Sequence, residues 1–194
     1  GLEVGELRHL LLTHIHLDHA GAAGSLVGEN PGLLVHVSEV GAPHLVDPSR
    51  LERSARRLYG DDFDRLWGPL VPVPEESIRV VGERVLDLEV FPTPGHASHH
   101  VSYLTADGAC CTGDAAGVRI QPGRYVAPVA PPPDIDVEAW ERTLDAIAER
   151  RPEHLRPDQV ALRKGLRAKW RQLGDDRELL VAECAYEQWH RLLF

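Results

Sequence analysis

An apolar run from Leu7 to Leu12 is followed at once by the segment Thr13-His14-Ile15-His16-Leu17-Asp18-His19. The apolar run reads as a buried strand. A buried strand has no need for four metal-capable side chains at its end, whereas a metal site does. His14 and His16 are two residues apart, so in extended backbone they project to the same side and can share one cation. The segment therefore predicts a metal site at the end of a strand.

Asp18 and His19 follow after the chain begins to turn, so we expect them to point elsewhere, towards a second cation. Small residues from Ala20 to Gly24 come next and predict a short helix. The alternative is that Asp18 only caps this helix and that the histidines lie on the surface. We favour the metal site, because a strand before the motif and a helix after it are the context it requires.

Two further clusters lie downstream. Thr93-Pro94-Gly95-His96-Ala97-Ser98-His99-His100 follows a predicted strand from Val85 to Phe91, and its Pro-Gly pair indicates a turn that presents His96 at a strand end. Thr112-Gly113-Asp114-Ala115-Ala116-Gly117 places a carboxylate on another turn after the short apolar run 109–111. A Gly-Asp turn alone is weak evidence. The order and chemistry of all three clusters agree.

Taken together, the His-x-His-x-Asp-His motif, the Pro-Gly-His turn and the Gly-Asp turn resemble the metallo-β-lactamase superfamily of hydrolases, from about Leu7 to about His154. The resemblance implies an α/β fold, an αββα sandwich of two mixed β-sheets flanked by helices, with the family's first strands missing before Gly1. It also implies two divalent metal ions, most simply zinc, with iron or manganese as alternatives. The implied ligands are His14, His16 and His96 for the first metal, Asp18 and His19 for the second, and Asp114 as the bridge.

One ligand expected from this family has no clear counterpart. The family has a final histidine on a loop that follows a helix and a short strand. The helix is predicted over 134–150, with an apolar face formed by Ile135, Val137, Trp140, Leu144 and Ile147. His154 is the nearest histidine after it, but it precedes the position where the strand should begin, and a surface role near the helix end is the commoner case.

Length and composition indicate a single domain over 1–194, with 158–194 as a C-terminal helical extension. The net charge of −9 argues against a nucleic-acid partner. No apolar run is long enough to cross a membrane.

Three cysteines form no disulfide framework, which suits the cytoplasm, although a signal peptide before Gly1 stays open. We expect Cys110 and Cys111 to be small core residues on a buried strand.

The remaining elements can be read coarsely. Strands are predicted at 33–37, 78–81 and 85–91, the last two as neighbours separated by Gly82. Residues 39–67 read as largely helical, with breaks at Pro43, Pro48 and Gly60. A hairpin is predicted around Asp107-Gly108. Two terminal helices, with Trp170, Tyr186 and Trp189, would cover the site or offer a homodimer contact.

Two segments are candidates for a substrate pocket: residues 59–67, and the connector with Arg119, Arg124 and Tyr125. The alternative, which we favour, is that Tyr59 and Trp67 pack between helices and that the arginines are solvated. His100 is a candidate for a supporting role behind the metal ligands or for a contact with substrate.

Two metals imply a mechanism in which a bridging hydroxide attacks a carbonyl or phosphoryl centre, with Asp18 orienting the nucleophile as the catalytic residue. Asp114 argues against an antibiotic-degrading β-lactamase, and His16 argues against the oxygen-reducing diiron branch. The glyoxalase-II-like and lactonase-like branches remain. We predict hydrolysis of a small thioester or ester, with a lactonase or a phosphodiesterase as the alternatives. The alternative of another class is a non-catalytic binding protein with an incomplete second metal site.

Overall fold

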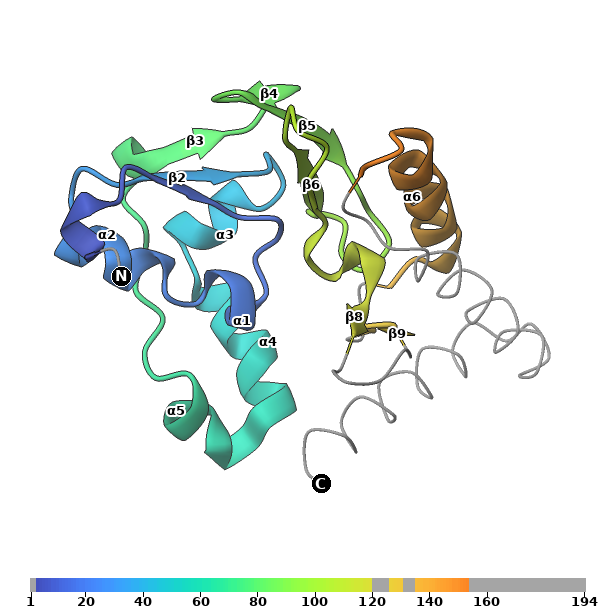
Figure 1. Ribbon diagram of the computed structural model, residues 1–194. Helices are drawn as coiled ribbons and strands as arrows, with labels where there is room; N and C mark the ends of the chain where they lie inside the picture. Colours follow the sequence, from blue (N-terminus) through green and yellow to red (C-terminus); the bar gives the residue numbers. More distant parts are fainter. Residues whose placement is uncertain (1–2, 120–125, 131–134, 154–194) are drawn as a thin grey trace. The chain divides into compact units, whose positions relative to one another are not determined.

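The computed structural model describes residues 3–119, 126–130 and 135–153 of the chain, which form parts of two units, Gly1–Glu83 and Arg84–Phe194 (Figure 1). His154, the terminal helices and the predicted extension 158–194 lie outside the described residues. The organisation as one domain therefore stays a prediction. Among the described helices, none combines the length and the apolar character needed to cross a bilayer.

Unit 1 is built on a three-stranded parallel sheet with helices against it. Its elements in chain order are η1 (Val4–Glu6), β1 (His9–Leu11), α1 (Leu17–Ala20), α2 (Ala23–Glu29), β2 (Leu34–Val37), α3 (Ala42–Val46), α4 (Ser49–Tyr59), η2 (Gly60–Asp62), α5 (Phe63–Leu66), η3 (Glu75–Ser77) and β3 (Ile78–Val80). The strand order is β1-β2-β3, with Leu10 opposite Val35 and Val35 opposite Ile78.

The core of unit 1 explains why this sheet forms. Val35 and Val37 alternate along β2 and are completely buried, together with Leu12 and Ile15 after β1 and with Ala23 and other small apolar residues of the helices. Figure 1 shows α1, α2 and α3 on one face of the sheet. The buried valines of β2 therefore fix its register with β1, and this register sets where β1 ends and where the histidine segment that leads into α1 begins.

Unit 2 is built on an antiparallel sheet and one long helix. Its described elements are β4 (Arg84–Val85), β5 (Leu88–Pro92), β6 (Val101–Leu104), β7 (Cys110–Cys111), η4 (Gly113–Ala116), β8 (Val118–Arg119), β9 (Val126–Ala127) and α6 (Val137–Glu149). The sheet order is β4-β5-β6-β7, and β8 pairs with β9 separately. Phe91, Ala115 and Ile147 form the buried contact between sheet and helix.

Most predicted elements are confirmed. The hairpin around Asp107-Gly108 joins β6 to β7, with Tyr103 opposite Cys111. In α6 the apolar face is buried as predicted, and Asp136 caps the helix by accepting from the backbone N–H of Ala139. The region 39–67, which was predicted to be largely helical, contains three α-helices, α3, α4 and α5. The prediction is right about the breaks at Pro48 and Gly60 but wrong at Pro43, which lies in the first turn of α3.

Four sequence predictions are wrong in detail. The strand predicted over 85–91 is two strands, because Leu86 has φ 52° and turns the chain between β4 and β5. This strand is also not a neighbour of 78–81, since β3 belongs to the parallel sheet. Of the two cysteines, Cys110 packs against the Phe91 cluster, but Cys111 is exposed. The three-stranded sheet is parallel and the four-stranded sheet is antiparallel, rather than each being mixed.

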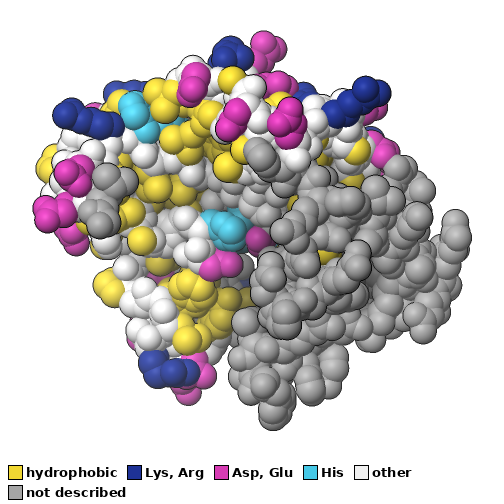
Figure 2. All heavy atoms as spheres, viewed as in Figure 1, with side chains coloured by type: hydrophobic (Ala, Val, Ile, Leu, Met, Phe, Trp, Pro, Cys, Tyr) yellow, Lys and Arg dark blue, Asp and Glu magenta, His cyan; other side chains and the backbone are white. Residues whose placement is uncertain are grey.

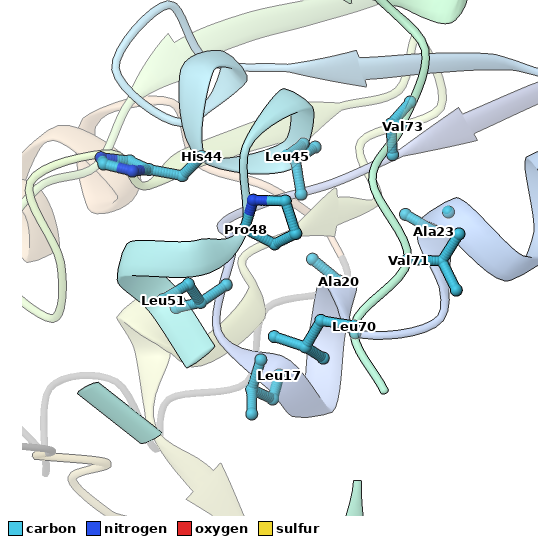
Figure 3. A pocket seen from close by; sticks show the side chains of 12 residues that line it. Leu17, Ala20, Ala23, His44, Leu45, Pro48, Leu51, Leu70, Val71 and Val73 are labelled. Carbon is cyan, nitrogen blue, oxygen red and sulfur yellow. The ribbon is translucent and has the colours of Figure 1, made fainter. Parts of the chain in front are cut away.

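A close backbone approach in unit 1 holds the loop after α5 against α2. A Cβ atom placed on Gly24 would lie 1.9 Å from the carbonyl oxygen of Val71. Figure 3 shows Val71 and Val73 on this loop, lining a small apolar pocket with Leu17, Leu45 and Leu51. Only glycine allows the loop to pass this close to the helix.

We expect Gly24→Ala to lower the free energy of unfolding by about 1–3 kcal/mol, because the loop must move away from α2. The matched control is Gly28→Ala in the same helix, where an added Cβ meets no atom within 4 Å. That change should be neutral or stabilising by roughly 0.5–1 kcal/mol. Urea unfolding of both variants measures the difference, and equal midpoints would contradict this account of the contact.

Candidate metal centre

Unit 1 gathers three of the predicted histidines around the start of α1. The backbone N–H of Leu12 still bonds to the carbonyl oxygen of His36, so the chain leaves the sheet just before the motif. His14 is completely buried, and its ring lies 4.7 Å from that of His16 and 4.0 Å from that of His19. A ring nitrogen of His14 is within 4.8 Å of one on each of these neighbours. His14 therefore lies between two imidazoles, with His16 as one neighbour and His19 as the other.

Asp18 lies in the first turn of α1, next to His19. The Nε2 atom of His19 is 3.5 Å from a carboxylate oxygen of Asp18, and the Asp18 side chain is 60% exposed. The N-cap of α1 is His16, and no side chain makes a capping hydrogen bond there. The alternative in which Asp18 only caps the helix is therefore wrong. Its carboxylate is open to solvent and available to a ligand.

Unit 2 places His96 at the end of β5 through a tight turn. Gly95 has φ 127°, and a Cβ atom on it would lie 2.3 Å from the Cα atom of Trp140. The carbonyl oxygen of Gly95 accepts from the backbone N–H of Asp136, and the hydroxyl of Thr143 donates to the carbonyl oxygen of Pro94. The turn is thus packed directly on the first turns of α6, where only glycine fits.

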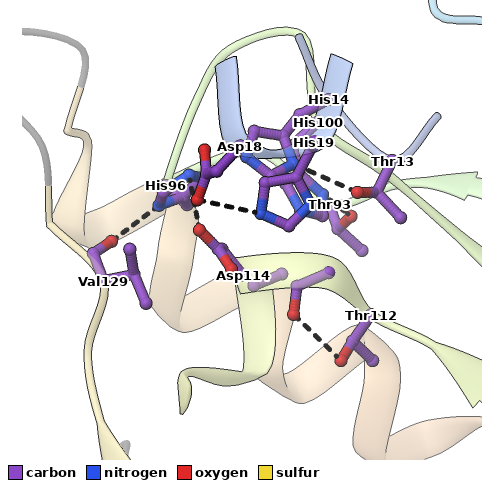
Figure 4. A network of polar contacts seen from close by, with 12 residues as sticks. Thr13, His14, Asp18, His19, Thr93, His96, His100, Thr112, Asp114 and Val129 are labelled. Carbon is purple, nitrogen blue, oxygen red and sulfur yellow. Dashed lines mark hydrogen bonds and ion pairs between the residues drawn. The ribbon is translucent and has the colours of Figure 1, made fainter. Parts of the chain in front are cut away.

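The tautomer of His96 follows from its hydrogen bond. Nδ1 lies 2.6 Å from the carbonyl oxygen of Val129, and a carbonyl can only accept, so Nδ1 carries the proton and donates it (Figure 4). The lone pair of the neutral ring is then on Nε2. That atom lies 3.5 Å from a carboxylate oxygen of Asp114, and both side chains are buried. A nitrogen lone pair and a carboxylate that face each other in this way are stabilised by a proton or a metal ion between them.

The spacing of these acceptors fits a metal ion. Two ligand atoms bound to one tetrahedral zinc at about 2.0–2.2 Å lie roughly 3.3–3.6 Å apart. Both the His96–Asp114 pair and the His19–Asp18 pair have this separation, 3.5 Å. The second nitrogen of His96 is already engaged by a carbonyl, which is the usual arrangement behind a metal-binding histidine. The donor set therefore suits a divalent cation.

Asp114 is positioned by the same helix that holds His96. It lies in η4, directly after β7, and is 6% exposed. The indole N–H of Trp140 donates to the backbone carbonyl of Ala115 at 2.6 Å, which ties this turn to α6. The ring of Trp140 also lies 5.9 Å from that of His96.

A buried polar chain supports the turn from behind. The hydroxyl of Thr93 is 2.7 Å from Nδ1 of His100 and 2.9 Å from the hydroxyl of Ser102, and His100 lies edge-on to His96 at 5.8 Å. This position fits the supporting role predicted for His100.

The six predicted site residues thus form two clusters, one in each unit. His14, His16, Asp18 and His19 lie together in unit 1, and His96 lies beside Asp114 in unit 2. Sequence reasoning missed the carbonyl of Val129 and the indole of Trp140. A buried tryptophan on an apolar helix face is itself a signal, because its N–H needs an acceptor. His154, Arg124 and Tyr125 lie outside the described residues.

Comparison with known proteins agrees with this chemistry. Residues 1–155 match the family model of the metallo-beta-lactamase superfamily. The chain belongs to this superfamily, and its α/β fold with two sheets and flanking helices is confirmed as that of the family.

Individual relatives are more distant. The metallo-beta-lactamase fold-containing protein ST1585 of Sulfurisphaera tokodaii is 30% identical over 156 residues, covering 76% of this chain and 58% of that protein. The YobT protein of Bacillus subtilis is 31% identical over 124 residues, covering 58% and 48%. The chain thus spans about half the length of these curated relatives.

Solved structures show the same fold. The crystal structure of ST1585 matches with a TM-score of 0.71 at 27% identity, covering 82% of this chain and 68% of that one. TTHA1429 from Thermus thermophilus matches with a TM-score of 0.66 at 22% identity, covering 89% and 65%. TTHA1623, solved in a di-iron-bound form, matches with a TM-score of 0.51 at 26% identity, covering 72% and 62%.

The tautomer of His96 can be tested directly. In metal-free protein with ¹⁵N-labelled histidine, we expect a slowly exchanging imidazole proton on Nδ1 of His96, since that proton is buried and bonded to Val129. His96→Gln identifies the resonance. Added zinc should shift the Nε2 resonance and leave the Nδ1 proton in place. A proton found on Nε2 would contradict the assignment.

Proposed function

We propose that this protein is a metal-dependent hydrolase of the glyoxalase-II-like or lactonase-like branch, acting on a small thioester or ester. The observation that carries the proposal is the pair of acceptors formed by His96 and Asp114, buried and spaced for a shared cation. Membership of a superfamily of metallo-hydrolases supports the reaction class.

The ligands we propose are those suggested by the motifs. His14, His16 and His96 hold the first metal, Asp18 and His19 hold the second, and Asp114 bridges them. The closeness of the His14 ring to those of His16 and His19 supports the unit 1 part of this set. Zinc is the metal we propose, and the di-iron form of TTHA1623 makes iron the first alternative, with manganese after it.

When bound, two divalent cations lower the pKa of a water molecule towards 7 and stabilise negative charge on the attacked oxygen. The chain's residues supply orientation and proton handling. His96 is fixed in one tautomer by Val129, so its Nε2 lone pair stays aimed at the centre. The exposed carboxylate of Asp18 can accept a hydrogen bond from the attacking water and hold it in line with the substrate.

The substrate class within the family is the open choice. We favour a thioester or ester over a lactone, and we place a phosphodiester third. A non-catalytic binding protein with an incomplete second metal site is the alternative of another class, and intact Asp18, His19 and Asp114 argue against it. We also propose a small-molecule substrate rather than nucleic acid, a homodimer as the candidate assembly, and a cytoplasmic location.

Metal content and activity test the proposal together. The protein should bind two equivalents of metal by elemental analysis and hydrolyse members of a panel of thioesters, esters and lactones. Asp114→Ala should lose at least one equivalent of metal and reduce kcat/KM by about 100-fold or more. The reason is that Asp114 is the proposed bridging ligand, so its removal takes one ligand from each metal. The matched control is Asp87→Ala, the same change at an exposed turn, which should alter neither quantity.

Different results point to different conclusions. One equivalent or none, under metal-replete conditions, would favour the binding-protein alternative. Two equivalents with no hydrolysis across the panel would keep the metal centre but refute the thioester and ester assignment.

A further inference from the structure

Unit 1 holds a pair of histidines outside the ligand motif. His9 lies on β1 and His36 on β2. The two strands pair in parallel, and His36 lies opposite Leu11, two residues beyond His9. Leu10 and Val35, which also lie opposite each other, pack in the core. Because side chains alternate along a strand, His9 and His36 project together from the other face of the sheet.

The two imidazole rings contact each other directly. Nδ1 of His9 lies 2.9 Å from Nε2 of His36, and the ring centroids are 5.1 Å apart. A hydrogen bond at this distance needs one ring to donate and the other to accept. In the described part of the chain, neither ring makes a hydrogen bond to any other residue. The pair is therefore not held by a carboxylate or a carbonyl, in contrast to His96.

The pair can be reached from solvent in its neutral form. His9 is exposed, whereas His36 is 8% exposed. Figure 2 shows histidine side chains that reach the surface at separate places on the face it displays. Burial and, after it, the positive charges of His9 and Arg79 lower the pKa of His36, so its ring stays neutral at neutral pH. Neutral imidazole is the form that binds metal ions.

The spacing of the two nitrogens suits a particular coordination geometry. Nitrogens bound to one ion at about 2.0–2.1 Å lie roughly 2.9 Å apart at neighbouring corners of a square or an octahedron, and roughly 3.3–3.4 Å apart at a tetrahedral ion. The observed separation of 2.9 Å matches the first case. Copper(II) and nickel(II) take such geometries with imidazole ligands, and copper(II) binds more tightly.

Binding of an ion requires a limited change in the pair. The ring that donates moves its proton to its other nitrogen through solvent, so each ring presents one lone pair and no proton is released overall. The rings also turn, so that the two lone pairs meet at the ion instead of along the line between the nitrogens. The exposed position of His9 allows this rotation and leaves room for water ligands.

The nearby charge of Arg79 opposes a cation at the pair. Arg79 lies opposite His36 on β3, and its Nη1 donates to the carbonyl oxygens of Glu76 and Ile78 at 2.8 Å and 2.7 Å. These bonds fix the guanidinium on its own segment of chain. We therefore expect a site of lower affinity than one with three or more protein ligands.

We propose that His9 and His36 form an additional metal site for copper(II), and more weakly for nickel(II), that bridges β1 and β2. The inference goes beyond the hydrolase function and does not depend on it. An ion held by both strands binds the folded sheet and not the unfolded chain, so it stabilises unit 1 by mass action.

The test adds substoichiometric copper(II) to zinc-loaded protein with ¹⁵N-labelled histidine. The paramagnetic ion should broaden the resonances of His9 and His36 first, and His9→Gln and His36→Gln identify these resonances. A chromogenic zinc indicator reports whether copper has displaced zinc elsewhere in the protein.

Affinity is measured in parallel by competition with a chelator. His9→Gln should weaken copper(II) binding roughly 100-fold, because the second imidazole acts at a high effective concentration. Since His9 is exposed, we expect this variant to fold, and circular dichroism checks it. Copper(II) should also raise the urea midpoint of the wild type more than that of His9→Gln. The matched control is His44→Gln, the same change in α3, which should alter neither quantity.

Three results would overturn the inference. The first is broadening confined to the histidines of the ligand motif and His96. The second is a copper(II) affinity that is unchanged in a folded His9→Gln variant. The third is an equal loss in His44→Gln, which would indicate adventitious binding to surface histidines. A protein without hydrolase activity that still loses copper(II) binding in His9→Gln would support this site while the proposed function fails.

Discussion

Imidazole and carboxylate groups are costly to bury unless each polar atom finds a partner, and this constraint governs the candidate metal centre. His14 and His96 are completely buried, and Asp114 nearly so. Val129 satisfies one nitrogen of His96, which leaves the other facing a carboxylate. In a low-dielectric setting that pair is stable only with a proton or a metal ion between its members. The chemistry of the site is thus a consequence of how its residues are buried.

One helix provides most of the geometry in unit 2. At the start of α6 the backbone N–H of Asp136 donates to the carbonyl oxygen of Gly95. The hydroxyl of Thr143 donates to the carbonyl oxygen of Pro94. Trp140, further along the same face, donates to Ala115, next to Asp114. Two turns that come from different strands are therefore held by a single rigid element. The 3.5 Å separation of His96 and Asp114 is set by α6 rather than by either turn alone.

The parts of this arrangement that depend on neighbouring residues could be predicted from the sequence. The motif from His14 to His19, the turn at His96, the hairpin at Asp107-Gly108 and the apolar face of α6 are short-range patterns, and all four form.

Features that depend on distant contacts could not be predicted in this way. The carbonyl of Val129 lies 33 residues from His96, and nothing near either residue indicates the bond. Leu86 adopts a positive φ that its residue type does not suggest, so one expected strand became two. The packing of Tyr59 with Leu17 depends on how α4 and α1 share a core, which no pattern near either residue indicates. Short-range patterns thus identify candidate ligands, whereas their orientation and their surroundings are set by tertiary packing.

In the proposed centre the ligands come from both units, and this has a thermodynamic consequence. Each unit orders its own ligands through its own core, by β2 and α1 in unit 1 and by α6 in unit 2. A cation that binds the ordered ligands of a folded unit, and not the unfolded chain, stabilises that fold by mass action. Because its ligands must also be deprotonated, acid opposes the same equilibrium. In this proposal metal content, fold stability and activity should change together when the metal or the pH is changed. The turns that carry Gly95 and Asp114 contribute to all three quantities.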